Sequence, residues 1–254
     1  MNIKDKKYVI TLGCSFSTST LNDENLVERG HTFGDVIAKH YGMELIELGG
    51  PGGSNQYIKN RFFEWFGKNP NKWNDTFVVV AWTEPGRHMW WNNKTNEWFN
   101  DTNQIYIKDT VRFNDINLIH GWSYRDRTKY AQNFMRNNYD EMRSYIEQIV
   151  TLQSCMKLWG IPYIMFNSLF DVDVENHLIE GNGKTDNKTM WDNLIDTKYF
   201  YRNEIHTSFR DMMEPLHQKP VKDLWIREND SHPNKKAHKI WGDYLIEFIG
   251  KVYV

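Results

Sequence analysis

Four short apolar runs along the chain have the composition of buried β-strands. They are rich in β-branched and aromatic residues and are bounded by residues that favour turns. The runs are KYVITL at 7–12, ELIEL at 44–48, FVVVAW at 77–82 and IPYIMFN at 161–167. FVVVAW is apolar at every position, which is typical of a strand that helices cover on both faces of a parallel sheet.

Between and after these runs, apolar residues recur at helical spacing. The stripes comprise Phe33, Val36 and Ile37; Ile58, Phe62, Trp65 and Phe66; Met142, Tyr145, Ile146, Ile149 and Met156; and Ala237, Ile240, Trp241, Tyr244, Leu245 and Phe248. Thr32 and Asp35 are suited to begin the first helix, and Gly42 to end it. The alternation predicts an α/β fold, a single three-layer α/β/α domain over residues 1–254 with a parallel sheet. Segments 85–128 and 170–220 lack a clear period, and we expect irregular insertions there.

The charge distribution argues against nucleic acids and membranes as partners. The chain has 31 basic and 33 acidic residues, a net charge of −2, and no basic stripe. No segment has the roughly eighteen apolar residues that cross a bilayer, and the N-terminus lacks a secretory pattern. Cys14 and Cys155 form no CxxC pattern, which favours a reducing compartment but leaves a disulfide open. We therefore expect a soluble cytoplasmic protein; a virion-associated component would have the same features.

The polar segments that follow the predicted strands contain the residues suited to catalysis. In an open parallel sheet, ligands bind beyond the carboxyl ends of the strands. The first strand runs into Gly-Cys-Ser at Ser15, the second into GGPGGSN at 49–55 and the third into TEPGR at 83–87, while DSHPN at 230–234 precedes the last helix. A serine hydroxyl becomes nucleophilic when a neighbouring histidine takes its proton, so Ser15 and His232 are the candidate nucleophile and base.

These four segments together resemble the conserved blocks of the SGNH/GDSL family of serine hydrolases, in the family's order. KYVITLGCSFS is similar to the block with the catalytic serine, and NDSHPNKKAH to the block with the catalytic acid and histidine. The resemblance implies a flavodoxin-like sheet, Ser15 as nucleophile, His232 as base and Asp230 as its partner. It also implies that Gly52 and Thr83 contribute to the oxyanion hole. The pair Trp82 and Thr83, followed by Arg87, resembles the corresponding segment of SGNH-like proteins of tailed bacteriophages.

Three positions depart from the family pattern. Cys14 replaces an aspartate that is mainly structural in the family, and Thr83 replaces the oxyanion asparagine. A threonine hydroxyl can donate one hydrogen bond, and nearby Asn55 is a candidate to compensate by contacting the substrate. Asp230 precedes His232 by two positions, where the family usually has three, so a Ser–His dyad is an alternative to a triad.

Other roles remain open for several of these residues. Ser15 could cap a helix, His232 could be a helix-start residue, and Arg87 is either a substrate-binding residue or a surface charge. The remaining histidines have no metal-ligand spacing, and GGPGG is not a dinucleotide fingerprint. We therefore expect neither a metal nor a cofactor.

The sequence thus predicts a serine esterase that acts on a small ester. Aromatic residues make up 15% of the chain, with 11 tryptophans, which favours a carbohydrate O-acyl ester as the substrate. We expect parts of the two insertions to wall the cleft over Ser15, with Trp90, Trp91 or Trp122 facing it. The alternatives are an SGNH-fold binding or structural module with weakened catalysis and an acyltransferase with the same residues. The sequence leaves the oligomeric state open.

Overall fold

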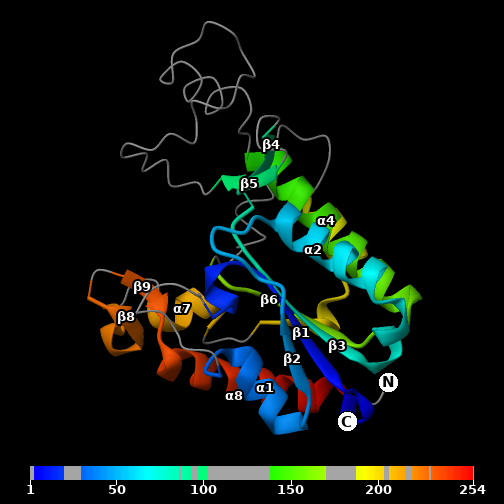
Figure 1. The fold of residues 1–254 in the computed structure, drawn as a ribbon. Coiled ribbons are helices and arrows are strands. Elements are labelled where there is room, and N and C mark those ends of the chain that lie inside the picture. The colour runs from blue at the N-terminus through cyan, green and yellow to red at the C-terminus, as the bar shows by residue number, and fades with distance from the viewer. Residues whose placement is uncertain are drawn as a thin grey trace, which may run out of the picture.

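A parallel five-stranded sheet forms the centre of the fold, with the strand order β2-β1-β3-β6-β7 (Figure 1). The computed structural model describes residues 3–19, 30–85, 87–92, 97–101, 138–169, 187–202, 206–215, 219–228 and 230–253. The strands are β1 (Tyr8–Leu12), β2 (Glu44–Glu47), β3 (Thr76–Trp82), β6 (Tyr163–Asn167) and β7 (Phe200–Tyr201). All four pairings between neighbours are parallel, which confirms the sheet predicted from the apolar runs.

Helices cover both faces of this sheet. One layer contains α2 (Asn55–Lys68), α4 (Asn138–Leu158) and α6 (Asn187–Leu194), and the other contains α1 (Phe33–Tyr41), α7 (Phe209–Met213) and α8 (Lys235–Tyr253). Figure 1 shows α2 and α4 on one side of β1 and β3, with α1 and α8 on the other. The predicted three-layer α/β/α architecture is confirmed.

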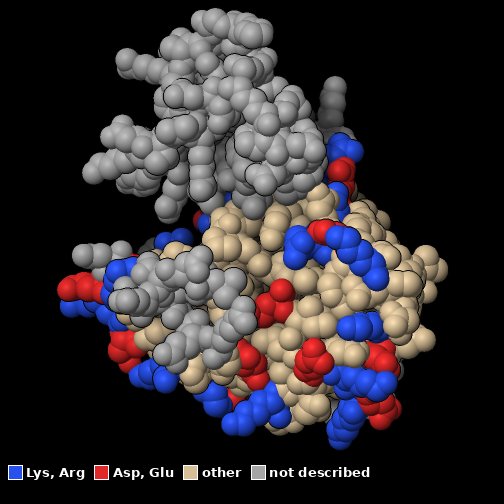
Figure 2. All heavy atoms as spheres, viewed as in Figure 1, with Lys and Arg blue, Asp and Glu red and all other residues tan. Residues whose placement is uncertain are grey.

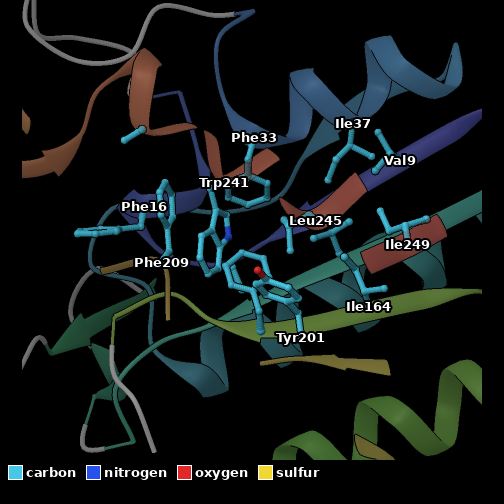
Figure 3. Packing of buried hydrophobic residues seen from close by; sticks show 14 of the residues in the cluster. Val9, Phe16, Phe33, Ile37, Ile164, Tyr201, Phe209, Trp241, Leu245 and Ile249 are labelled. Atoms are coloured by element: carbon cyan, nitrogen blue, oxygen red, sulfur yellow. The ribbon is translucent and has the colours of Figure 1, made fainter. Parts of the chain in front are cut away.

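The central strand β3 supplies side chains to both cores because successive residues of a strand point to opposite faces. Val78, Val80 and Trp82 pack with α2 and α4, whereas the alternate residues Phe77 and Val79 pack with α1 and α8. All of these side chains are fully buried. Figure 3 shows the second core, where Phe33, Phe209 and Trp241 gather beside the sheet. The unbroken apolar run therefore reflects burial on both faces.

Helix α1 begins and ends as the sequence predicts. The Thr32 side chain accepts a hydrogen bond from the backbone N–H of Asp35, and the Asp35 carboxylate accepts one from the backbone N–H of Thr32. This reciprocal pair is a capping box, which satisfies N–H groups that the first helical turn leaves unpaired. Gly42 ends the helix with a φ of 69°, a left-handed conformation that glycine adopts without steric cost.

The two predicted insertions contain regular elements, which corrects the expectation that they are irregular. Segment 85–128 contains the antiparallel hairpin of β4 (His88–Asn92) and β5 (Glu97–Asp101). Segment 170–220 contains α6, β7 and α7, and β7 adds a fifth strand to the sheet. A two-residue strand has too few positions to show a period of two, so only its pairing with β6 identifies it.

The remaining described elements are short. The 3₁₀ helices are η1 (Ile3–Asp5), η2 (Ser15–Ser17), η3 (Pro70–Asp75), η6 (Thr197–Tyr199) and η7 (Lys222–Leu224). A small antiparallel pair, β8 (Trp225–Arg227) and β9 (Asp230–Pro233), precedes α8. Asn234 then begins α8, because its side-chain oxygen accepts hydrogen bonds from the backbone N–H groups of Lys236 and Ala237.

Basic and acidic side chains are mixed on the described part of the surface that Figure 2 shows, so neither sign of charge dominates this face. Within the described ranges, no helix is long and apolar enough to cross a membrane.

A buried histidine links α8 to the start of α1. The His238 side chain is 1% exposed, and its Nδ1 accepts a hydrogen bond from the backbone N–H of Phe33 at 3.2 Å. The His238 ring also contacts the rings of Phe33 and Phe209. Burial disfavours the charged imidazolium and lowers the pKa of His238 to about 3. The native protein therefore holds this histidine neutral.

We predict that this histidine makes the fold sensitive to acid. An unfolded chain takes up this proton near pH 6.5, whereas the native protein does not until about pH 3. Stability from the neutral ring is therefore fully present above about pH 6.5 and is lost as the pH falls toward 3, by an amount on the order of a few kcal/mol. His238→Gln should flatten the pH dependence of the free energy of unfolding, measured by urea denaturation between pH 7.5 and pH 4.

The control for this prediction is the exposed His40 of α1. His40→Gln should keep the pH dependence of the parent protein. An equal pH dependence in the parent and the His238→Gln protein would contradict the assignment.

Candidate active site

Ser15 lies where β1 ends and η2 begins, at the carboxyl edge of the sheet. The turn is tight: the backbone N–H and Oγ of Ser17 both bond to the carbonyl of Cys14, at 3.0 and 2.8 Å. Gly13 makes room for it, since an added Cβ would lie 2.2 Å from the Ser17 Oγ. The side chain of Ser15 is half-buried and bonds to a histidine, whereas no side chain caps η2. The structure thus gives Ser15 a contact other than the helix-capping one.

His232 lies in β9 and approaches Ser15 from the far end of the sequence. The Ser15 Oγ lies 3.0 Å from His232 Nε2, and Asp230 Oδ1 lies 2.5 Å from His232 Nδ1. Asp230 also accepts a hydrogen bond from the backbone N–H of His232. The ring of Phe16 packs against the imidazole, with centroids 5.4 Å apart. One ring nitrogen therefore faces a hydroxyl and the other a carboxylate, and both contacts fix the ring orientation.

The environment of Asp230 favours the ionised carboxylate. Burial alone would raise the pKa of this group, but the hydrogen bonds from the side chain and backbone of His232 outweigh it, and the nearby charges of His232 and Arg227 add to them. The net effect lowers the pKa of Asp230. Arg227 Nε lies 3.7 Å from Asp230 Oδ2. Asp230 therefore stays charged beside His232 down to a lower pH than an ordinary aspartate.

The GGPGG loop lies against the Ser15 turn. The backbone N–H of Gly50 bonds to the carbonyl of Gly13 at 3.2 Å, which ties the loop to the end of β1. Gly52 has a φ of 69°, in the left-handed region that favours glycine. Among the described residues, no acceptor takes a hydrogen bond from the backbone N–H of Gly52 or of Ser15. These two donors are suited to bind an oxyanion.

Asn55 and Thr83 are buried beside the site instead of lining the cleft. Asn55 Oδ1 accepts the backbone N–H of Thr83 at 2.9 Å, and its Nδ2 donates to the carbonyls of Thr83 and Glu84. The whole amide is thus used to hold the end of β3. Asn55 is a positioning residue here, which corrects the substrate contact expected from the sequence. Thr83 Oγ1 is buried and has no partner among the described residues.

An open cleft of about 500 Å³ lies over these groups. Its lining residues are Ser15, Phe16, Pro51, Gly52, Glu84, Arg87, Leu169, Arg210, Asp230, Ser231 and His232. The structure therefore brings together five of the predicted site residues, from segments at both ends of the chain: Ser15, Gly52, Arg87, Asp230 and His232. Arg210 was missed, because nothing in its local sequence distinguishes it from a surface charge on a short helix.

Both insertions contribute to the wall, through Arg87 and Arg210. The tryptophans expected to face the cleft cannot be placed in it, because Trp122 and the side chains of Trp90 and Trp91 lie outside the described residues.

Cys14, in place of the family's aspartate, is buried with its Sγ 3.7 Å from Ser168 Oγ. Within the described ranges, no three histidine, cysteine or acidic residues are grouped to hold a metal ion.

The fold is that of GDSL/SGNH-type esterases and lipolytic proteins, as comparison with solved structures shows. It is similar to the psychrotrophic esterase EstA from Pseudoalteromonas sp., with a TM-score of 0.51, 10% identity and coverage of 97% of this chain and 98% of that one. It is also similar to a proposed lipolytic protein of the G-D-S-L family from Desulfitobacterium hafniense, with a TM-score of 0.50, 11% identity and coverage of 96% and 99%.

A third similar structure is a carbohydrate esterase family 2 enzyme with a carbohydrate-binding domain from Corynascus thermopiles (Myceliophthora fergusii). The TM-score is 0.52 at 12% identity, over 97% of this chain and 66% of that one. No protein-family model and no curated protein sequence matches the chain. At these identities the likeness is one of fold alone.

Proposed function

We propose that this protein is a serine esterase in which Ser15 is the nucleophile, His232 the general base and Asp230 its orienting acid. The observation that carries the proposal is the chain of contacts in the cleft: 3.0 Å from Ser15 Oγ to His232 Nε2, and 2.5 Å from His232 Nδ1 to Asp230 Oδ1. A nucleophile bonded to a base, and a base bonded to a third group, form the arrangement that activates a hydroxyl.

In the proposed reaction, Ser15 Oγ attacks the ester carbonyl carbon while its proton passes to His232 Nε2. The tetrahedral oxyanion is bound by the backbone N–H groups of Ser15 and Gly52, which both line the cleft. The bond to the alcohol oxygen then breaks, and that oxygen takes the proton from His232. Water attacks the acyl-enzyme by the same route in reverse, which releases the acid and regenerates Ser15.

We further propose a carbohydrate O-acyl ester as the substrate. The esterase from Corynascus thermopiles is a carbohydrate esterase with a carbohydrate-binding domain, and the present chain shares its fold. The cleft is open and holds polar and charged groups besides Ser15, which suits a hydroxylated substrate better than a lipid chain. An acyltransferase would use the same residues, with a second alcohol replacing water in the last step.

The proposal is tested with a fluorophosphonate probe, which reacts with activated serines. The Pseudoalteromonas esterase of this fold is inhibited by monoethylphosphonate. We expect one probe per chain on the peptide that contains Ser15, and hydrolysis of 4-nitrophenyl acetate by the same preparation. Ser144, exposed on α4, is the matched control and should stay unlabelled. A folded protein that neither takes the probe nor cleaves the ester would instead be the binding module that the replaced oxyanion asparagine suggests.

A further inference from the structure

Two arginines from different parts of the fold line the cleft together with Ser15. Arg87 follows β3, and Arg210 lies in the first turn of α7, after the carboxyl end of β6. The backbone N–H of Arg210 bonds to the carbonyl of Ser168 at 2.9 Å, which fixes α7 to that end of the sheet. Both guanidinium groups thus belong to the same wall as the proposed nucleophile.

Each arginine is held by a glutamate on its own segment. Arg87 Nε bonds to Glu84 at 3.2 Å, and Arg210 Nε bonds to Glu214 at 2.8 Å. These contacts use only the inner nitrogen of each guanidinium. Among the described residues, no acceptor takes a hydrogen bond from the four Nη groups. The glutamates therefore orient the arginines and, within the described part of the chain, leave their outer nitrogens without an acceptor.

The unused hydrogen-bonding capacity of this wall consists mainly of donors. The two carboxylates of the cleft are already engaged, Glu84 by Arg87 and Asp230 by His232 and Arg227. The Arg87 side chain is only 13% exposed and lines the cleft. A planar guanidinium matches a carboxylate in geometry and binds it through two parallel hydrogen bonds. An anion in the cleft would provide hydrogen-bond acceptors for the outer nitrogens of both arginines.

We infer that the cleft selects esters that carry a carboxylate, which Arg87 and Arg210 bind next to the scissile bond. A sugar acid with an acylated hydroxyl has this chemistry, and so does the half-ester of a dicarboxylic acid. The two differ only in whether the carboxylate lies on the alcohol or the acyl side. This inference rests on the proposed function for catalysis, but binding of the anion does not require the reaction.

The kinetic test compares matched esters with and without a carboxylate. On the alcohol side, the charged member is an O-acetylated methyl glycoside of galacturonic acid with a free carboxylate, and the neutral member is the same O-acetyl ester of methyl galactoside. On the acyl side, the charged member is 4-nitrophenyl hemisuccinate and the neutral member is 4-nitrophenyl butyrate. We expect kcat/KM for the charged member of one pair to exceed that of its neutral partner by about 10- to 100-fold, the usual effect of hydrogen bonds to a charged group. The pair that responds identifies the side.

Arg87→Gln and Arg210→Gln should each reduce this ratio by about tenfold, through KM more than kcat, because a neutral amide loses the charge. Two surface arginines with the same kind of glutamate partner provide controls: Arg61, paired with Glu64, and Arg143, paired with Glu147. Arg61→Gln and Arg143→Gln should keep the ratio of the parent protein. Equal kcat/KM within both ester pairs would overturn the inference and leave the esterase proposal standing.

A binding measurement separates failure of this inference from failure of the esterase proposal. If the alcohol-side pair responds, galacturonate should bind the unmodified protein at least about tenfold more tightly than galactose by calorimetry, and added salt should weaken this binding. Arg87→Gln and Arg210→Gln should abolish the preference. Arginine-dependent galacturonate binding without hydrolysis of any ester would support the anion site and refute the esterase. Equal binding of both sugars together with equal kinetics would refute the anion site.

Discussion

Replacing Ser15 with alanine is expected to lower kcat for 4-nitrophenyl acetate by at least about 10³-fold, because no other group in the chain of contacts can form the acyl-enzyme. The substitution removes one half-buried oxygen whose hydrogen bond goes to His232. The free energy of unfolding should therefore change by no more than about 1 kcal/mol. Initial-rate kinetics and urea denaturation on the same preparation measure both quantities.

Ser144→Ala, which removes an exposed hydroxyl on α4, is the matched control and should keep the parent rate. Probe labelling provides a second readout that does not depend on turnover. If Ser15→Ala retained turnover and labelling, another serine would be the nucleophile, and the assignment of the cleft would be wrong.

Replacing Asp230 with asparagine is expected to lower kcat by about 10³- to 10⁴-fold while leaving the fold intact. The Asp230 carboxylate accepts from His232 Nδ1 at 2.5 Å, which directs the lone pair of Nε2 toward Ser15. An amide can present its N–H₂ group to Nδ1 and so favour the opposite tautomer, in which Nε2 carries a proton and cannot accept one. It also removes the negative charge that stabilises the imidazolium formed during the reaction.

This prediction distinguishes a Ser–His–Asp triad from a Ser–His dyad, the alternative raised by the short spacing between Asp230 and His232. Asp223 offers the control, because its carboxylate is also paired with a cation, Lys236, and lies on the surface. Asp223→Asn should have the parent kcat. A loss of less than tenfold in Asp230→Asn would show that His232 acts without the carboxylate.

The ionisation of Asp230 follows from the same contacts. The lowered pKa of Asp230 keeps its carboxylate charged below the range in which an ordinary aspartate is protonated. Initial rates for 4-nitrophenyl acetate should therefore show no loss from protonation of Asp230 in the pH range where an ordinary aspartate is protonated.

Much of the fold could be predicted from the sequence because its strongest elements are encoded locally. The run at 77–82 is apolar at each position and became the fully buried β3, and Thr32, Asp35 and Gly42 set the ends of α1. The two-residue β7 could not be found in this way. Its strand conformation depends on pairing with β6, which local sequence does not encode.

The candidate site also combines features that local sequence predicts with features that depend on distant segments. Ser15, Gly52 and His232 could be predicted as candidates because each follows a strand or precedes a helix in a recognisable segment. The kinds of chemical group that are available also follow from the sequence: a hydroxyl, an imidazole, a carboxylate and glycine-rich backbone. It could not place Asn55 correctly, because a buried amide that bonds to the backbone of Thr83 looks the same in sequence as one that faces a ligand.

What the sequence by itself determined is therefore the order of strands and helices, the buried faces and the residues that are candidates for catalysis. Only the tertiary structure decided which of them meet: His232 lies beside Ser15 and Asp230 behind it, whereas Asn55 is turned inward. It also brought Arg210 into the same cleft. The physical reason is that local patterns depend on neighbours along the chain. Distances within a cleft depend instead on how distant segments are packed around a shared core.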